Sequence, residues 1–359
     1  MSYELFISRA SPYSMKVAAL LRYLGVEHRL VIQNVVRRYR LIRRLTGKTM
    51  VPVLRNGDWA INDSTAIAEY VLRLPQLARE LYMPPGIDTL SLLLEDFADE
   101  WMVRWMVQSR WGHPEDVRHV EQLIGAELTG GLPGAGRLLG RAAGQAIRFR
   151  LEDWGIGPAN AEVLSGSARR TLEALEAALG DGRLYLFGDV PSLADFGCYG
   201  PLGQYASDPS GARVLRSAEF GRVRAYVARF DAMLLGEVEV GSATDASLQA
   251  VESLMGEALG TYWEVMVANL EAMGQGKRPA MVEATLLDGA SFVFAPSRYL
   301  YSRLQSWLQL IEEGYASRRE LFGDGGASVE RALIGRVEQL VARPQAVELL
   351  KMYPGLGLR

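Results

Sequence analysis

The sequence predicts an α/β domain over residues 1–83, followed by an all-helical region. Two observations carry this fold class. In the first part of the chain, short apolar runs with strand periodicity alternate with helical patterns. From Asp88 onward strand patterns nearly vanish, and apolar residues recur at helical spacing instead. We therefore expect a small mixed domain and a larger helical one in the same chain.

The N-terminal domain is predicted to begin with a strand, a helix and a second strand. Apolar and polar residues alternate over residues 3–8, which indicates a short strand. Pro12 suits the first turn of a helix because its fixed φ is helical and its missing N–H is not needed there. The apolar residues after it share one helical face until Gly25, which provides a left-handed cap. Residues 28–32 form the second predicted strand.

A hairpin and a helix are predicted to complete this domain. Apolar runs at residues 51–54 and 59–61 flank Asn56-Gly57, which is a strong local signal for a hairpin. The polar residues 62–65 offer helix caps ahead of an apolar stripe from Ile67 to Leu72. A βαβ unit followed by a ββα unit makes a compact α/β domain.

The composition excludes several classes of protein. The 359 residues carry a net charge of −3, and this near-balance argues against a dedicated nucleic-acid binder. No apolar run approaches the ~18–20 residues of a membrane-spanning helix. Glu4 and Arg9 stand where a signal peptide would have a basic start and an apolar stretch. We therefore expect a cytoplasmic protein with no nucleic-acid or membrane partner.

Residues that commonly bind metals are scarce. The single cysteine, Cys198, excludes an intrachain disulfide and a cysteine-cluster metal site, and we expect it to be a small buried apolar residue. His113 and His119 are six residues apart, which fits no ordinary helical ligand spacing. We expect both histidines at the surface and no metal cofactor.

Three motifs in the first seventy residues carry a family resemblance. They are Ser11-Pro12-Tyr13-Ser14, Met50-Val51-Pro52-Val53-Leu54 and Asp63-Ser64-Thr65-Ala66-Ile67. In this order and spacing they resemble the N-terminal thioredoxin-like domain of cytosolic glutathione transferases. The resemblance implies glutathione as the co-substrate.

The resemblance also implies roles for individual residues. Pro52 would be in the cis form, and Val51 before it would offer its main chain to the cysteinyl part of glutathione. Asp63 and Ser64 would hold the γ-glutamyl group. Ser11, immediately before Pro12, would be the catalytic residue.

Elementary chemistry agrees with this role for Ser11. A helix N-terminus presents unpaired N–H groups and a positive dipole end, and a hydroxyl there can donate to a thiolate. Ser11 would keep the sulfur of glutathione in its nucleophilic form rather than attack anything itself. Taken alone, Ser11 is better explained as a plain helix cap, and the context of Pro52 and Asp63-Ser64 reverses this preference. Tyr13 and Ser14 could also reach the thiol, and Tyr13 could instead belong to the core.

The basic segment at residues 37–48 has two interpretations. It holds six basic residues and no acid. Either it is a solvated helix face, or one or two of its arginines bind the glycine carboxylate of glutathione. The Asn-Pro pair that the family usually has before the Val-Pro strand is absent, which leaves the identity of that partner open.

A second group of motifs lies in the helical region. Residues 184–196 are similar to the signature of the C-terminal domain of glutathione transferases, with Ser192 and Asp195 spaced as a capping box. Asp195 is therefore expected to be structural rather than catalytic. Residues 95–101, 153–158 and 201–209 also resemble a bacterial branch of these enzymes.

The remaining helical patterns define the rest of the fold. A stripe from Leu90 to Trp105 predicts a long amphipathic core helix. The glycine-rich residues 130–144 are either a loop or a glycine-spaced helix. The resemblance implies an all-α, transferase-type domain over residues 84–235.

Residues 236–359 exceed the usual length of the family, and we expect them to be additional helices packed on the body. The patterns predict helices over residues 248–266, 300–311 and 329–340. An aromatic cluster there could line a pocket or simply pack the extension. Its members are Phe292, Phe294, Tyr299, Tyr301 and Trp307. The extension could cover the substrate cleft or enlarge a dimer contact.

The sequence thus leads to a glutathione transferase-like enzyme that stabilises the glutathione thiolate for attack on a small electrophile. The resemblance also implies a homodimer. Two alternatives remain open. One is a non-catalytic binding or scaffold protein on the same fold. The other is a dedicated glutathione-dependent step, such as isomerisation or sulfur donation, in a biosynthetic or degradative pathway.

Overall fold

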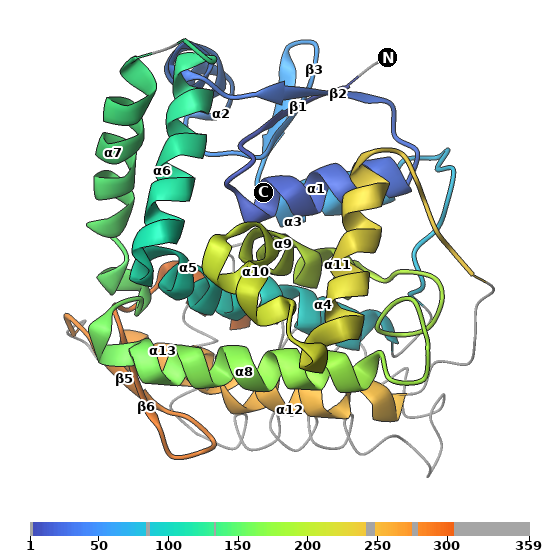
Figure 1. Ribbon diagram of the computed structural model, residues 1–359, viewed down its shortest axis with the longest axis vertical. Helices are drawn as coiled ribbons and strands as arrows, with labels where there is room; N and C mark the ends of the chain where they lie inside the picture. Colours follow the sequence, from blue (N-terminus) through green and yellow to red (C-terminus); the bar gives the residue numbers. More distant parts are fainter. Residues whose placement is uncertain (1–2, 84–86, 133, 242–247, 275–278, 305–359) are drawn as a thin grey trace.

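A computed structural model describes residues 3–83, 87–132, 134–241, 248–274 and 279–304 (Figure 1). A small sheet with its helices lies at one end, and the remaining helices stack beneath it. Within the described residues, no helix is long and apolar enough to cross a membrane.

The N-terminal sheet has four strands in the order β2-β1-β3-β4. The strands are β1 (Tyr3–Ile7), β2 (His28–Ile32), β3 (Val53–Asn56) and β4 (Trp59–Asn62). β1 pairs in parallel with β2 and antiparallel with β3, so that Leu5 lies between Leu30 and Leu54. β3 and β4 form the predicted hairpin. The order of strands and helices in this domain is confirmed.

Helices cover both faces of this sheet. α1 (Pro12–Tyr23) and α3 (Ser64–Leu72) pack together, and α1 faces the helical domain. On the other face, Ile42 of the π-helix η1 (Arg37–Ile42) packs on the apolar strand residues, next to α2 (Arg43–Thr46). Period-2 alternation sends neighbouring residues of one strand to opposite faces, which is why a short strand such as β1 serves two cores.

Three consecutive helical elements, which we call the rod, begin the helical domain. They are α4 (Ile87–Phe97), the π-helix η2 (Ala98–Met102) and α5 (Val103–Gly112). The predicted stripe from Leu90 to Trp105 is confirmed as core, because every member is at most 3 % exposed. The wider π-turn in the middle was not predicted.

The helical domain is built around α9 (Leu193–Ser207), which packs on α1, α4 and η2. α10 (Pro209–Leu215) and α11 (Gly221–Leu234) also pack on α9, and α8 (Ala161–Ala178) packs on α5 and α11. Short 3-10 helices join these elements: η3 (Glu152–Trp154), η4 (Pro158–Asn160) and η5 (Ala218–Phe220). Cys198 on α9 is buried, as predicted.

The glycine-rich stretch begins as a turn at Gly130 and Gly131 and continues as a helix from Ala135. α6 (Pro114–Thr129) and α7 (Ala135–Arg148) form an antiparallel pair beside α2. A Cβ on Gly140 would lie 1.9 Å from the carbonyl oxygen of Glu121. The glycines therefore permit backbone-to-backbone contact between the two helices. His113, which precedes α6, has a half-exposed side chain, and His119 is partly exposed.

The C-terminal extension differs from the prediction in two ways. The expected single helix over residues 248–266 is the 3-10 helix η6 (Leu248–Val251) followed by α12 (Glu252–Gly260) and α13 (Tyr262–Gly274). The helix is interrupted at Thr261, whose φ of −122° and ψ of −75° are not helical. A β-hairpin, β5 (Val282–Thr285) and β6 (Ser291–Phe294), was also not expected.

The predicted aromatic cluster divides between packing and the cavity described below. Phe292 is fully buried, and its ring centroid lies 4.8 Å from that of Trp101. Tyr299 is 42 % exposed. The predicted helix at residues 300–311 begins as expected up to Leu304. Trp307 and the predicted helix at residues 329–340 lie outside the described residues.

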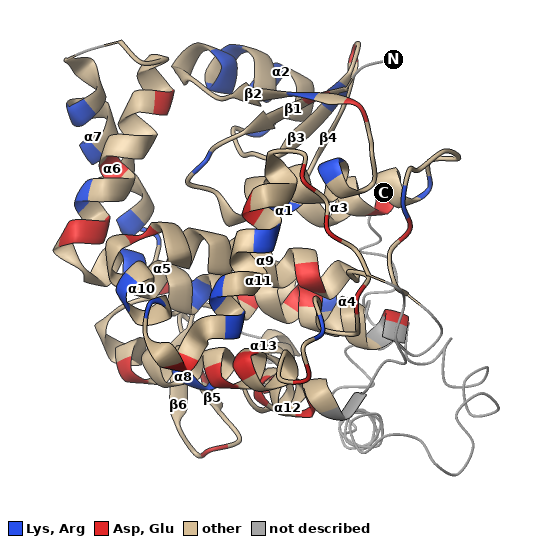
Figure 2. Ribbon diagram, turned by 45° about the vertical axis from the view of Figure 1, so that its right-hand side comes forward, with Lys and Arg blue, Asp and Glu red and all other residues tan. Residues whose placement is uncertain are grey.

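Figure 2 shows how charge is distributed over these elements. Basic residues gather around α2, and acidic residues lie along α4. Two acidic residues near the end of α4 are buried rather than solvated: Glu95 is 0 % and Asp96 is 2 % exposed. They therefore need partners inside the protein.

Asp195 anchors the start of α9, as predicted. Its carboxylate accepts from the N–H of Ser192 at 2.8 Å, the hydroxyl of Ser192 at 2.7 Å and the N–H of Leu186 at 2.8 Å. The hydroxyl of Tyr226 donates to it at 3.2 Å. The residue is completely buried.

We predict that Asp195→Ala lowers the free energy of unfolding by about 3 kcal/mol or more, because it removes a cap and leaves buried donors without an acceptor. Asp195→Asn, which keeps the shape and one acceptor oxygen, should cost less. Urea unfolding of the two variants measures the difference. A variant Asp195→Ala with unchanged stability and lost activity would contradict this structural role.

Candidate functional site

The loop before α1 places three hydroxyl groups in different environments. Ser11 caps α1, and its Oγ accepts from the N–H of Ser14 at 3.3 Å. Because Oγ serves there as an acceptor, its own hydrogen can point outward. Ser14 is fully buried, and its Oγ accepts from the N–H of Ser8. The hydroxyl of Tyr13 donates to the main-chain carbonyl of Asp99 at 3.0 Å.

Side chains from the helical domain hold this loop in place. Glu127 of α6 accepts from the hydroxyl of Ser8 and the N–H of Arg9, both at 2.6 Å. Arg110 donates to the carbonyl of Ala10 at 2.9 Å, and Gln204 donates to the carbonyl of Arg9 at 2.9 Å. The position of Ser11 is thus fixed by three helices remote in sequence.

The Val51–Pro52 peptide bond is cis, as the resemblance implied. The amide of Asn62 donates to the carbonyls of Met50 and Pro52, each at 3.0 Å. These bonds fix the loop on both sides of Val51. None of the hydrogen bonds among the described residues uses the Val51 main chain, which leaves its N–H and C=O for a ligand with peptide character.

Asp63 and Ser64 form the start of α3. Asp63 has a φ of 102°, and its Oδ1 accepts from the N–H groups of Thr65 at 3.0 Å and Ala66 at 3.3 Å. The hydroxyl of Ser64 donates to Oδ2 of Asp99 at 3.4 Å. The cap turns the Asp63 carboxylate toward the same cavity that Val51 and Pro52 line.

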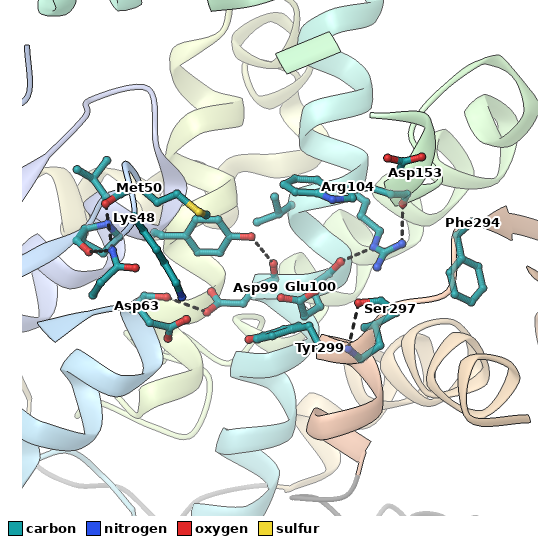
Figure 3. A pocket seen from close by; sticks show the side chains of 18 of the residues that line it. Lys48, Met50, Asp63, Asp99, Glu100, Arg104, Asp153, Phe294, Ser297 and Tyr299 are labelled. Carbon is teal, nitrogen blue, oxygen red and sulfur yellow. Dashed lines mark hydrogen bonds between the residues drawn. The ribbon is translucent and has the colours of Figure 1, made fainter. Parts of the chain in front are cut away.

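That cavity has a volume of about 320 Å³ and lies between the two domains (Figure 3). We call it the polar cavity. The predicted residues Tyr13, Val51, Pro52, Asp63 and Ser64 all line it. Lys48 and Met50 lie at one end, and Arg104, Asp153 and Phe294 lie at the other.

The C-terminal extension contributes part of this wall. Phe294, Ala295, Ser297, Tyr299 and Leu300 all line the polar cavity. The described part of the extension therefore lies against this cavity. Its location there depends on packing that no local pattern records.

A second cavity of about 270 Å³ adjoins the first. We call it the apolar cavity. Ser11 lies at its edge, together with Tyr13 and Val51, which line both cavities. Most of its remaining wall is apolar and comes from the helical domain: Val103, Met106, Val107, Trp111, Val120, Ile124, Ile147, Leu151 and Trp154.

Each of the two cavities is lined by one residue of the basic segment. Lys48 lines the polar cavity, and Arg38 lines the apolar cavity. Arg40, Arg43 and Arg44 are exposed, which matches the solvated-face interpretation for those residues.

A buried ion cluster lies directly behind the polar cavity. The ammonium group of Lys16 on α1 is paired with Glu95 and, at 2.7 Å, with Asp99. Burial alone would lower the pKa of Lys16, but the two carboxylates raise it, so the amine stays charged. Burial raises the pKa of Asp99 to about 7 although Lys16 opposes the shift.

Glu100 and Arg104 are functional candidates that the sequence did not reveal. Burial raises the pKa of Glu100 to about 8; Arg104 opposes this shift, and the charges of Asp96 and Asp99 add to it. Burial lowers the pKa of Arg104. The only available signal was their spacing of four residues on the predicted long helix, which places both on one face.

The described residues contain no cluster of three or more histidine, cysteine, aspartate or glutamate side chains suited to a metal ion. The two cavities instead suit a peptide-like, charged ligand beside an apolar one. The polar cavity offers main-chain groups and a helix N-terminus, and the apolar cavity offers an apolar wall.

Comparison with known families agrees with this arrangement. Residues 5–78 match the model of the glutathione S-transferase N-terminal domain, and residues 158–229 match that of the glutathione S-transferase C-terminal domain. The two models match in the order that the family has them. These two segments are therefore glutathione transferase domains, the first of them with a thioredoxin-like fold, and the chain carries extra C-terminal elements.

Several solved structures are similar in part. The β-etherase LigF from Sphingobium sp. strain SYK-6 is 16 % identical, with a TM-score of 0.46 over 66 % of this chain and 100 % of its own. The glutathione transferase GSTFuA3 from Phanerochaete chrysosporium is 17 % identical, with a TM-score of 0.47 over 65 % of this chain and 97 % of its own. No curated protein matches the chain. The family assignment therefore rests on the two domain models.

The raised pKa of Glu100 predicts a pH-dependent stability. The folded protein binds this proton up to about pH 8, whereas an unfolded glutamate loses it near pH 4.5. Because the folded state binds more protons between these values, the free energy of unfolding should fall as the pH rises through that range. Glu100→Gln lacks this titration, so its stability relative to wild type should rise from pH 5 to pH 8.5.

Urea unfolding at several pH values measures this difference. Glu69→Gln, at an exposed position of α3, is the matched control and should differ from wild type by the same amount at every pH. A pH-independent difference for Glu100→Gln would show that Glu100 is ionised in the folded protein at neutral pH.

Proposed function

We propose that this protein is a glutathione transferase-like enzyme that activates the thiol of glutathione at Ser11 for attack on a small electrophile. The observation that carries the proposal is the meeting of Ser11, Val51, Asp63 and Ser64 at two adjoining cavities. In this proposal, residues 1–83 bind glutathione, residues 84–235 supply the acceptor wall, and residues 294–300 of the C-terminal extension cover the polar cavity.

The polar cavity matches the charges of glutathione group by group. The Asp63 carboxylate suits the γ-glutamyl ammonium group, and Ser64 at the N-terminus of α3 suits its carboxylate. The Val51 N–H and C=O suit the cysteinyl peptide. Lys48, at the same end of the cavity as Met50, suits the glycine carboxylate.

The thiol of a glutathione held in this way lies between the two cavities, near Ser11. The hydroxyl of Ser11 and the N-terminal dipole of α1 both favour the thiolate over the thiol. Ser14 is buried, and the hydroxyl of Tyr13 already donates to Asp99. These contacts support Ser11 over the other two hydroxyl groups, while the ring of Tyr13 forms part of both cavity walls.

The apolar cavity is the proposed acceptor site. Its wall is rich in valine, isoleucine, methionine and tryptophan side chains, which favour an apolar body on the acceptor. A calorimetric titration with glutathione, followed by a conjugation assay with a reactive aryl halide, tests both halves of the proposal. Binding without conjugation would favour the non-catalytic alternative.

Asp63→Asn should weaken glutathione binding about tenfold, because it removes the charge that faces the γ-glutamyl ammonium group. Asparagine keeps the cap on α3 and tolerates a positive φ, so the fold should persist. Asp58→Asn, in the exposed hairpin turn, is the control. Equal affinity for all three proteins in calorimetry would remove Asp63 from the site.

Ser11→Ala should leave glutathione affinity nearly intact and lower turnover. Losing a hydroxyl donor to a charged acceptor costs about 1.5–3 kcal/mol, which corresponds to a rise of roughly 1–2 units in the thiol pKa. Activity should therefore recover partly at high pH. The pH–rate profile with a simple electrophile measures this, with Ser14→Ala as control. A profile for Ser11→Ala that superimposes on wild type would assign the thiolate to another donor.

The prediction of a cytoplasmic homodimer belongs to the same proposal. Light scattering at micromolar concentration should give twice the chain mass of 39.6 kDa. A mass equal to one chain would contradict the homodimer and leave the glutathione site unaffected.

A further inference from the structure

Arg104 is a buried cation at the end of the polar cavity opposite Lys48 (Figure 3). It is 7 % exposed. Its Nε donates to the main-chain carbonyl of Glu100 at 2.7 Å, and its Nη1 donates to that of Trp154 at 2.6 Å. Its Cζ lies 5.7 Å from the ring centroid of Phe292. Two neutral carbonyls and a ring thus fix its position.

No carboxylate among the described residues lies within 4 Å of this guanidinium group. Two acidic side chains share the cavity. Glu100, which faces Arg104, Asp96, Asp99 and Arg303, is mainly protonated at neutral pH. Asp153 is exposed, so water and salt screen its charge. The end of the cavity opposite Lys48 therefore presents a buried cation whose direct contacts among the described residues are two neutral carbonyls and a ring.

Glutathione does not need this charge. In the proposed function, on which this step rests, its ammonium group meets Asp63, and its two carboxylates meet Lys48 and the start of α3. Arg104 lies beyond Asp99 and Glu100 from that end of the cavity. A buried cation is costly unless an anion meets it, so an anionic group from another molecule is the natural partner.

We propose that Arg104 binds a carboxylate of the acceptor, so that the preferred acceptor is an electrophile with an apolar body and an anionic end. Nη2 donates no hydrogen bond to a described residue and is free to complete a charge-assisted pair. Val51, Val103 and Trp154 line both cavities, so one molecule can extend from the apolar cavity to Arg104.

A matched pair of probes tests this inference: 4-chloro-3,5-dinitrobenzoate and 4-chloro-3,5-dinitrobenzamide. In both, the glutathione thiolate attacks ring carbon 4, a carbon–sulfur bond forms, and chloride leaves with the electron pair of the carbon–chlorine bond. The thiol proton passes to solvent. The probes differ in the charge of one substituent.

Arg104→Gln should raise KM for the benzoate by about 10- to 100-fold, the range expected for losing a charged hydrogen-bonded contact. The benzamide should respond by no more than about threefold, and glutathione affinity should be unchanged. Arg104→Lys, which keeps the charge but loses the planar fork, should lie between wild type and Arg104→Gln. Arg141→Gln, at an exposed position of α7, is the control.

The outcomes separate this inference from the proposed function. Equal responses of the two probes to Arg104→Gln, with conjugation retained, overturn the carboxylate site and leave the enzyme intact. A loss of glutathione affinity in that variant assigns Arg104 to glutathione and also overturns it. Absence of conjugation of either probe by wild type overturns the proposed function and this inference with it.

Inhibition of wild type gives a test that does not depend on a variant's folding. The unreactive 3,5-dinitrobenzoate should inhibit about tenfold more strongly than 3,5-dinitrobenzamide. Equal inhibition by the two compounds overturns the inference whatever Arg104→Gln does.

Discussion

The arrangement of the two domains depends on the buried ion pairs that Lys16 forms with Glu95 and Asp99. Lys16 belongs to α1 of the first domain, whereas its partners Glu95 and Asp99 belong to the rod that begins the second. All three are nearly inaccessible to water, so none can lose its partner cheaply. Ser64 and Thr65 also donate to this cluster. The start of α3, where the proposed glutathione-binding residues lie, is therefore held against the helices that contain Glu95 and Asp99.

Around this cluster the protein separates two kinds of chemistry. The polar cavity collects main-chain groups, hydroxyls and charges, and the apolar cavity beside it collects aliphatic and aromatic side chains. The loop at Ser11 lies where the two meet, held by Glu127, Arg110 and Gln204. A thiolate needs a polar neighbour, while an apolar acceptor is bound better without one. The proposed transfer requires that the polar cavity and the apolar cavity adjoin each other.

Residues of the C-terminal extension form part of the wall of the polar cavity. Asp96 of α4 accepts from Tyr262 at 2.7 Å and from Arg303 at 2.7 Å, which joins the extension to the same rod that pairs with Lys16. The amide of Asn160 donates to the carbonyl of Val293 at 2.6 Å and holds the hairpin. One continuous set of polar contacts therefore runs from α1 through α4 to the wall that contains Phe294 and Tyr299.

The sequence by itself determined the elements whose signal is local. These elements are the strands of the N-terminal sheet, the helix that Pro12 opens, the Asp195 cap and the motif residues of the proposed glutathione site. Their signals come from neighbours a few positions apart. The hairpin at β5–β6 was missed although Asp288-Gly289 is flanked by alternating apolar residues, because the helical patterns around it dominated. The tertiary structure alone decided the pairing of Lys16, the ionisation of Glu100 and the exposure of Arg104 to a cavity. These depend on groups brought together from distant segments, and burial changes the energy of a charge in a way that no sequence window contains.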